Sequence, residues 1–245
     1  MSNPQALDIV IPYHPKDVET IIKCVDSCRM FVKDVRNIYI LSRDNPHVDG
    51  TTWIPEESFH FKMADIRAAG IREDRVGWYF QQLMKIHADM VIDGLSENFL
   101  IVDSDVVFKN QVDFFNANGK PYYAFGREYY EPYFKHMARL FPGLTKQFAD
   151  KSGICHHMVF NLHVLAEIRG KIGGDAVAWK AILGAVDTTE MSGFSEYELY
   201  FNYMIKYHPS EMEIRPLAWT DARYESDNDN NYHYVAYHAW MRIRR

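Results

Sequence analysis

Phe99-Leu-Ile-Val-Asp103-Ser-Asp105-Val-Val-Phe108 is an apolar run interrupted by two carboxylates one residue apart. Its first four residues are all apolar, which is typical of a strand buried on both faces. Such a strand would stop at Asp103 and present Asp103 and Asp105 at an edge of a sheet. Because an unpaired buried carboxylate is very costly, the pair is solvated, hydrogen-bonded in a turn, or bound to a cation. Mg²⁺ or Mn²⁺ would suit these oxygens and leave positions for phosphate, and an Asp-Ser-Asp turn that caps backbone groups is the alternative.

Composition places the chain among globular proteins. Its 245 residues are 47% hydrophobic and 15% aromatic, so we expect one domain over residues 1–245. The 33 acidic and 27 basic residues give a net charge of −6, which argues against a broad nucleic-acid surface. Because no segment has the apolar length of a transmembrane helix or signal, the sequence predicts a soluble, cytoplasmic protein. The three cysteines lack partners for a zinc site and are expected to be reduced packing residues.

The N-terminal part predicts a strand, a helix and a second strand. Residues 7–11 form an apolar strand that ends at Pro12, and residues 37–41 form another that ends at Ser42. Residues 16–31 between them show helical spacing, with an apolar stripe of Val18, Ile21, Ile22, Val25 and Cys28. This βαβ arrangement implies parallel pairing. Since ligands bind at the carboxyl ends of such strands, the loops at 12–17, 42–47 and 103–105 should share one edge.

Residues 77–91 predict an amphipathic helix. Its buried stripe contains Tyr79, Leu83, Ile86 and Met90, and Lys85 falls on the opposite, polar side with Gln81, Gln82 and Asp89. Most of these residues are explained by simple packing of the helix on the sheet. Arg75 and Lys85 are also candidates to contact a phosphate or a carboxylate.

The second half offers several histidines and acids. Residues 120–125 could form a strand, and the aromatic residues of the partly helical segment 127–148 form either a wall for a sugar or a plain core. His156 and His157 are adjacent on a strand-like segment, so at most one faces a site. Ser195 and Glu198 fit a capping box at a helix that runs to about residue 207. Glu196 is then either a first-turn acid that complements the helix dipole or a catalytic group. His233 and His238 fall on opposite faces of the last strand-like segment.

Four features together resemble GT-A fold glycosyltransferases that use nucleotide sugars, particularly small soluble bacterial and viral members. They are the opening Val10-Ile-Pro-Tyr-His-Pro15, the segment from Gly77 to Lys85, the strand with its D-x-D and the late acidic helix start. The resemblance implies an α/β, Rossmann-like fold with an open, mixed, mostly parallel sheet flanked by helices. Residues 1–110 would form the nucleotide-binding half and residues 111–245 the acceptor-binding half. Mn²⁺ or Mg²⁺ would be held by Asp103, Asp105 and His238, with His233 as the competing histidine.

The same resemblance assigns the remaining site residues. Residues 158–161 would line the sugar or acceptor pocket, and Arg75 and Lys85 would face the diphosphate, next to Asp103 and Ser104 of the motif. The nucleoside would contact the loops after the first two strands, namely Pro12, Tyr13, His14, Ser42, Arg43 and Asp44.

The implied reaction moves a sugar from a nucleoside-diphosphate sugar, with a UDP-sugar favoured, to a hydroxyl of a carbohydrate or glycan acceptor. A divalent cation would stabilise the departing diphosphate. Glu196 would take the proton of the acceptor in an inverting transfer. Two alternatives stay open: a haloacid dehalogenase-type phosphatase that uses Asp103 and Asp105 with Asp175 as the later acid, and a catalytically silent sugar-nucleotide-binding module.

Overall fold

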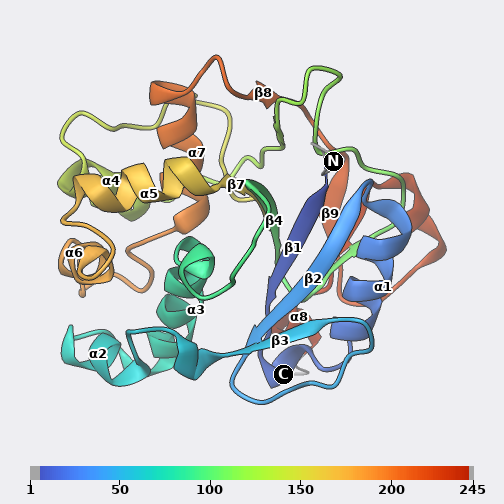
Figure 1. The fold of residues 1–245 in the computed structure, drawn as a ribbon, viewed down its shortest axis with the longest axis horizontal. Coiled ribbons are helices and arrows are strands. Elements are labelled where there is room, and N and C mark those ends of the chain that lie inside the picture. Colours follow the sequence, from blue (N-terminus) through green and yellow to red (C-terminus); the bar gives the residue numbers. More distant parts are fainter. Residues whose placement is uncertain (1–5, 243–245) are drawn as a thin grey trace.

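Five strands form the central sheet of the protein, whose residues 6–242 are described by a computed structural model (Figure 1). The strand order is β3-β2-β1-β4-β7, and every neighbouring pair is parallel except β4 with β7. This confirms the predicted α/β class with a mixed, mostly parallel sheet. The strands of the sheet are β1 (Leu7–Pro12), β2 (Val35–Ser42), β3 (Thr52–Pro55), β4 (Asn98–Val102) and β7 (His157–Asn161).

Both faces of the sheet are covered, because alternate residues of β1 and β4 enter two different apolar clusters. Val10 and Ile101 pack in the cluster that contains α3 (Val76–Ile86) and α7 (Glu196–Tyr207). Ile9 and Leu100 pack instead against α1 (Ile21–Phe31). The run at residues 99–102 is fully buried, as its uninterrupted apolar character predicted.

Helix α1 begins later than its sequence pattern predicted. Pro15–Asp17 form a separate 3-10 turn, and the helix starts only at Ile21. Val18 and Ile22, which we expected on the buried stripe, are 62% and 58% exposed. Ile21, Val25 and Cys28 of the predicted stripe are buried as expected, together with Cys24 and Ser27. Val18 precedes the helix, and Ile22 lies off its buried face. All three cysteines are free and buried.

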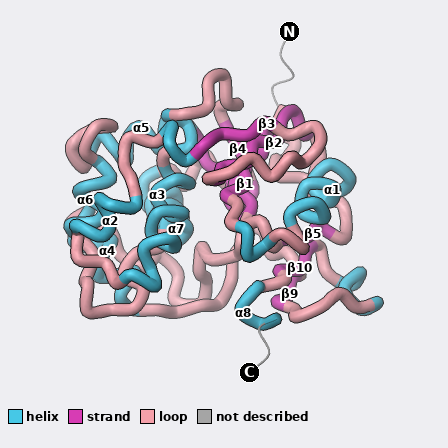
Figure 2. The backbone as a smooth tube through the Cα atoms, turned by 90° about the horizontal axis from the view of Figure 1, so that it is seen from below, coloured by secondary structure: helices cyan, strands magenta, loops and turns pink. Residues whose placement is uncertain are grey.

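The other helices gather beside one face of the sheet. Figures 1 and 2 both show α2 (Met63–Ala68), α4 (Glu131–Leu140), α5 (Leu162–Lys171) and α6 (Ala178–Gly184) around α3 and α7, on the side away from α1. The helix predicted over 77–91 ends at Ile86 and is followed by a 3-10 turn, Ala88–Met90. Among the helices of residues 6–242, none has the length and apolar character needed to cross a membrane.

Two smaller sheets complete the fold. β5 (Val106–Phe108) pairs antiparallel with β10 (Tyr234–Ala236), which pairs in parallel with β9 (Trp219–Asp221). The strand predicted over 120–125 is reduced to β6 (Tyr122–Tyr123), which pairs with β8 (Glu213–Ile214). The last helix is α8 (Ala239–Arg242), and the remaining 3-10 turns are Glu56–Ser58, Glu73–Arg75 and Asp227–Asn231.

Candidate functional site

The turn that carries Asp103 and Asp105 lies between two sheets. Asp103 directly follows β4, and its carbonyl accepts from the Val106 backbone N–H at 3.0 Å, where β5 begins. Because β5 pairs with β10, the chain after β10 returns to this turn, and the Tyr237 N–H donates to the Asp105 carbonyl at 2.8 Å. This ladder brings His238 beside Asp105, although 133 positions separate them.

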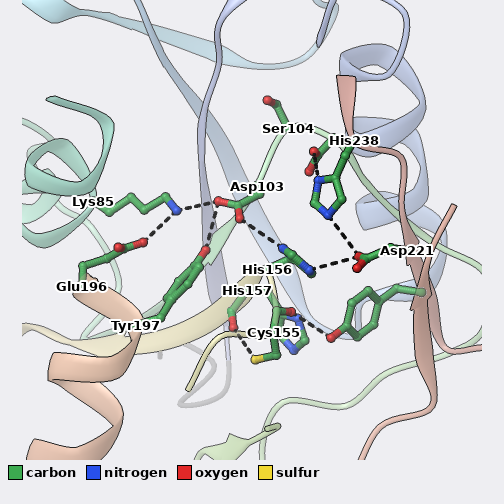
Figure 3. Close-up of polar contacts among 12 residues, drawn as sticks. Lys85, Asp103, Ser104, Cys155, His156, His157, Glu196, Tyr197, Asp221 and His238 are labelled. Carbon is green, nitrogen blue, oxygen red and sulfur yellow. Dashed lines mark hydrogen bonds and ion pairs between the residues drawn. The ribbon is translucent and has the colours of Figure 1, made fainter. Parts of the chain in front are cut away.

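Lys85 joins two carboxylates in the interior (Figure 3). Its Nζ lies 2.6 Å from Asp103 Oδ1 and 2.7 Å from Glu196 Oε1, and the Tyr197 hydroxyl donates to the same Asp103 oxygen at 3.1 Å. Our expectation that Lys85 lies on the solvent side of its helix is wrong, since the residue is 1% exposed. Its ammonium group can be buried there because two carboxylates compensate its charge.

One ammonium group faces two carboxylates here, of which Glu196 is fully buried and Asp103 is partly exposed. Burial raises the pKa of Glu196, and Lys85 compensates this only in part. At Asp103 burial acts in the same direction, but Lys85 and His156 outweigh it and hold the pKa of that carboxyl well below its usual range. Burial tends to lower the pKa of Lys85, but the two carboxylates raise it overall. Glu196 is therefore the member of this cluster with the greater tendency to accept a proton.

A second polar group continues from Asp103. His156 Nδ1 lies 3.7 Å from Asp103 Oδ2, and His156 Nε2 lies 3.3 Å from Asp221 Oδ1. His238 contacts the same Asp221 oxygen through Nε2 at 3.0 Å, and Asp105 Oδ2 through Nδ1 at 2.8 Å (Figure 3). The ligand atoms of His156, Asp221 and His238 all lie within 4.8 Å of one another, so these residues could hold a metal ion.

Only His156 of the adjacent histidine pair faces this group, in agreement with the expectation that at most one does. His156 has a left-handed backbone with φ of 64°, and β7 begins at the next residue. His157 instead packs among Phe108, Phe114 and Tyr234. His233 lies elsewhere, where its Nδ1 accepts from the Ala218 N–H at 3.1 Å.

The carboxylates change the ionisation of both histidines. Burial tends to lower the pKa of His156, but Asp103 and Asp221 outweigh it and raise the pKa to about 9. Burial opposes charge at His238 as well, yet Asp105 and Asp221 raise its pKa to about 10. Each imidazole thus faces two carboxylates, an arrangement that favours a positive charge, whether a proton or a cation, on each ring.

Two adjoining cavities open beside these groups. The first has a volume of about 460 Å³ and is lined by the residues of the Lys85 cluster and by Asp105, His156 and His238. The second, of about 400 Å³, lies at the loop after β1 and is lined by Tyr13 and His14. Both cavities are lined by Lys16, Arg75, Trp78 and Gln81.

The structure therefore brings many of the predicted site residues together. Those that line the first cavity are Arg75, Lys85, Asp103, Ser104, Asp105, Glu196 and His238. Pro12 ends β1 and is buried. Within the described part of the chain, neither cavity is lined by Ser42, Arg43, Asp44 or residues 158–161. Ser42 is buried and its hydroxyl donates to the Asp44 carbonyl at 2.9 Å, while residues 158–161 belong to β7 inside the sheet.

The predicted capping box at α7 forms only in part. Ser195 Oγ accepts from the Glu198 N–H at 3.2 Å, as expected. The carboxylate of Glu198 does not return to Ser195 but accepts from Ser152 Oγ at 2.5 Å and from Asn202 Nδ2 at 2.9 Å. These hydrogen bonds form in place of the capping-box contact to the Ser195 backbone, because they give a buried carboxylate two donors.

Asp221 and Tyr197 are functional candidates that sequence reasoning missed. Asp221 is the last residue of β9, at the start of a polar, acidic segment over residues 221–231. Its position at the end of a strand is the same signal that marked Asp103, but the strand is too short to be recognised from its pattern. Tyr197 is next to Glu196 in α7, where nothing in the sequence distinguishes it from a core aromatic residue.

One solved structure agrees with this architecture. The structure of mouse xyloside xylosyltransferase 1, apo form, is similar with a TM-score of 0.52 at 10% sequence identity, covering 94% of this chain and 97% of that chain. The apo structure of the bifunctional glycosyltransferase WbbM has a TM-score of 0.49 at 12% identity, covering 97% of this chain and 46% of that chain. The first likeness confirms the expected glycosyltransferase-like fold. Among curated proteins, no match to the chain is found. A family model matches residues 4–230, and the chain belongs to that family, which is described as "Family of unknown function (DUF6492)".

Proposed function

We propose that this protein is a metal-dependent glycosyltransferase that moves a sugar from a nucleoside-diphosphate sugar, preferably a UDP-sugar, to a hydroxyl of a carbohydrate acceptor. One observation carries the proposal: Asp103, Asp105 and His238 line a cavity at the carboxyl end of β4 that adjoins a second cavity at the carboxyl end of β1. A glycosyltransferase-like fold supports the same conclusion. The second cavity would take the nucleoside and the first would take the diphosphate, the sugar and the acceptor.

The side chains at this site are suited to Mn²⁺ or Mg²⁺. Asp105 Oδ1 is buried and has no hydrogen-bond partner within residues 6–242, so a carboxylate oxygen remains to be satisfied. Carboxylate oxygens and imidazole nitrogens are ligands that Mn²⁺ accepts, and Mg²⁺ takes the oxygens. A cation held near Asp103, Asp105 and His238 would supply positive charge to the departing diphosphate.

Arg75 is the side chain that we assign to the diphosphate. It lines both cavities, and its guanidinium lies 4.6 Å from the ring centroid of Trp78. Its Nε donates to the Met191 carbonyl at 3.1 Å, which holds the side chain in place. Tyr13 and His14 would contact the nucleoside. Lys85 is already engaged by Asp103 and Glu196, so we assign it to orienting these carboxylates and not to phosphate.

Glu196 is the proposed general base of an inverting transfer. Its raised pKa suits a group that must accept a proton from the acceptor hydroxyl. Lys85 holds Oε1, and the Gln82 side chain, with its amide nitrogen turned towards Glu196, donates to Oε2. An acceptor hydroxyl must therefore displace Gln82 to reach this oxygen.

The phosphatase alternative has less support. Asp175, the later acid that this reading requires, accepts from Arg169 Nε at 2.7 Å and does not line the cavity that contains Asp103. A catalytically silent sugar-nucleotide-binding module would bind the donor without transferring its sugar, so a measurement of sugar transfer distinguishes it from a transferase.

The test combines binding and product analysis. Calorimetry with UDP and GDP, with and without Mn²⁺, should show binding that needs the cation and prefers UDP. Glu196→Gln should keep this binding and lose transfer by roughly 10²-fold or more. Asp150→Asn, at an exposed site, is the matched control. Failure of every nucleoside diphosphate to bind would refute the function, and a product with retained anomeric configuration would refute the role of Glu196.

A further inference from the structure

Two imidazoles and a carboxylate converge beside the D-x-D turn. We propose that a first-row divalent cation is bound directly by Nε2 of His156, Nε2 of His238 and the Asp221 carboxylate, and that Asp103 and Asp105 orient the two rings from behind. The inference rests on the proposed function for the presence of a cation and names its ligands. It differs from the set expected from the sequence, Asp103, Asp105 and His238, because His156 and Asp221 replace Asp103 and Asp105 as direct ligands.

The separations of the ligand atoms suit one ion. Asp221 Oδ1 lies 3.0 Å from His238 Nε2 and 3.3 Å from His156 Nε2. Neighbouring ligands of one ion, each at about 2.1 Å from it, are about 3.0 to 3.4 Å apart for bond angles between the octahedral and the tetrahedral value. The two ring centroids are 4.9 Å apart and lie on the same side of Asp221 (Figure 3). Small side-chain adjustments would then place the three donors around a cation.

Each ring has a carboxylate at its other nitrogen. His238 Nδ1 lies 2.8 Å from Asp105 Oδ2, and His156 Nδ1 lies 3.7 Å from Asp103 Oδ2. At His238, the Asp105 carboxylate accepts from Nδ1–H, which leaves the Nε2 lone pair for the metal and fixes the ring orientation. At His156, Asp103 lies beside Nδ1 at an ion-pair distance. His156 Nε2 is buried and makes no well-aligned hydrogen bond within the described chain, although it points at Asp221 (Figure 3).

Asp103 is poorly placed to act as a direct ligand. Its Oδ1 is already contacted by Lys85 and by the Tyr197 hydroxyl, at 2.6 and 3.1 Å. The charge of Asp103 is thus largely compensated before any cation arrives. Within residues 6–242, the carboxylate of Asp221 has no such lysine partner, and its ion-pair partners are the two imidazoles. Asp221 is therefore the carboxylate that is available to a cation.

The ligand set also selects the ion. Two nitrogen donors suit Mn²⁺, Co²⁺ or Zn²⁺, whereas Mg²⁺ prefers a shell of oxygen atoms. We therefore expect Mn²⁺ and Co²⁺ to bind more tightly than Mg²⁺, in the absence of any nucleotide.

Binding of Mn²⁺ alone to the full chain tests the ligand set by calorimetry and pulsed electron paramagnetic resonance. The wild type should show two coordinated imidazole nitrogens. His156→Gln should retain one, and Asp221→Asn should bind Mn²⁺ roughly 10²-fold more weakly. Asp105→Asn should weaken binding about 10- to 100-fold, as for a residue behind a ligand, and keep both nitrogens. Asp150→Asn is the control, and circular dichroism without metal verifies the fold of each variant.

Unchanged Mn²⁺ affinity in both His156→Gln and Asp221→Asn, or a single coordinated nitrogen in the wild type, would overturn the inference. Absence of Mn²⁺ binding in the wild type would overturn it too. These outcomes are separable from failure of the proposed function, because nucleoside-diphosphate binding and sugar transfer are measured independently of the ligand set.

Discussion

Replacing Lys85 with methionine should destabilise the protein severely at neutral pH. The ammonium lies 2.6 and 2.7 Å from two carboxylates, and Lys85 and Glu196 are almost completely buried. Removing one partner of a buried ion pair costs about 3–5 kcal/mol, because the other charge is left uncompensated. Here two carboxylates lose their partner, so we expect a loss of about 5 kcal/mol, a large part of a typical domain stability of about 5–15 kcal/mol.

The loss should depend on pH in a defined direction. Without Lys85, the pKa values of Asp103 and Glu196 in the folded state rise, and that of Glu196, which burial already raises, lies further above its unfolded value. The folded variant therefore binds protons more readily and loses stability as the pH rises. In the wild type, Lys85 helps to depress the pKa of Asp103, and the resulting stability is present above a pH of about 4 and lost below it. The stability difference between wild type and variant should therefore be larger at pH 7.5 than at pH 5.0.

Urea unfolding followed by circular dichroism at both pH values measures this difference. Lys135→Met, which removes only an exposed pair with Glu131, is the matched control and should lose far less stability. The double variant Lys85→Met/Glu196→Gln should recover about 1–3 kcal/mol relative to the sum of the single changes. A loss below about 1 kcal/mol at pH 7.5, where breaking a buried pair should cost several, or a deficit that grows on acidification, would refute the reasoning.

Three further predictions concern packing and buried polar groups. Gly153→Ala should lower the free energy of unfolding by about 1–3 kcal/mol. The Cβ of the alanine would lie 2.5 Å from the Tyr197 carbonyl oxygen, which is too close for a normal contact. Unchanged urea unfolding would contradict this close approach. Glu198→Ala should lower the melting temperature and cost about 1–3 kcal/mol, because Ser152 loses its carboxylate acceptor and Asn202 keeps only the Glu198 backbone carbonyl. Mn²⁺ affinity should not change. Burial lowers the pKa of His136 to about 4, so the contribution of this one group to stability should be complete above pH 6.5 and fall towards pH 4 by about 1.4 kcal/mol per pH unit. His136→Leu should show a shallower pH dependence of the urea midpoint, and an identical slope would count against the assignment.

The sequence by itself determined the elements whose pattern is local. The apolar runs at residues 7–11 and 99–102 predicted β1 and β4, and the D-x-D was correctly placed where β4 ends. Ser195 correctly marked the start of α7, because an N-cap depends on residues a few positions away. Helix α1 was placed correctly except for its first turn, where Pro15 begins a separate 3-10 turn.

Only the tertiary structure decided how the site is assembled. Lys85 has the sequence position of a surface lysine, and it is buried because α7 brings Glu196 to it across 111 positions. His156 lies at the site and His157 does not, because the backbone at His156 is left-handed. His238 lies there and His233 does not, because β5 pairs with β10. Asp221 joins both histidines from a strand of three residues. Periodicity along the chain indicates which side of a helix or strand is apolar. It does not indicate which distant element packs against that side, because the order of the strands in the sheets determines those contacts.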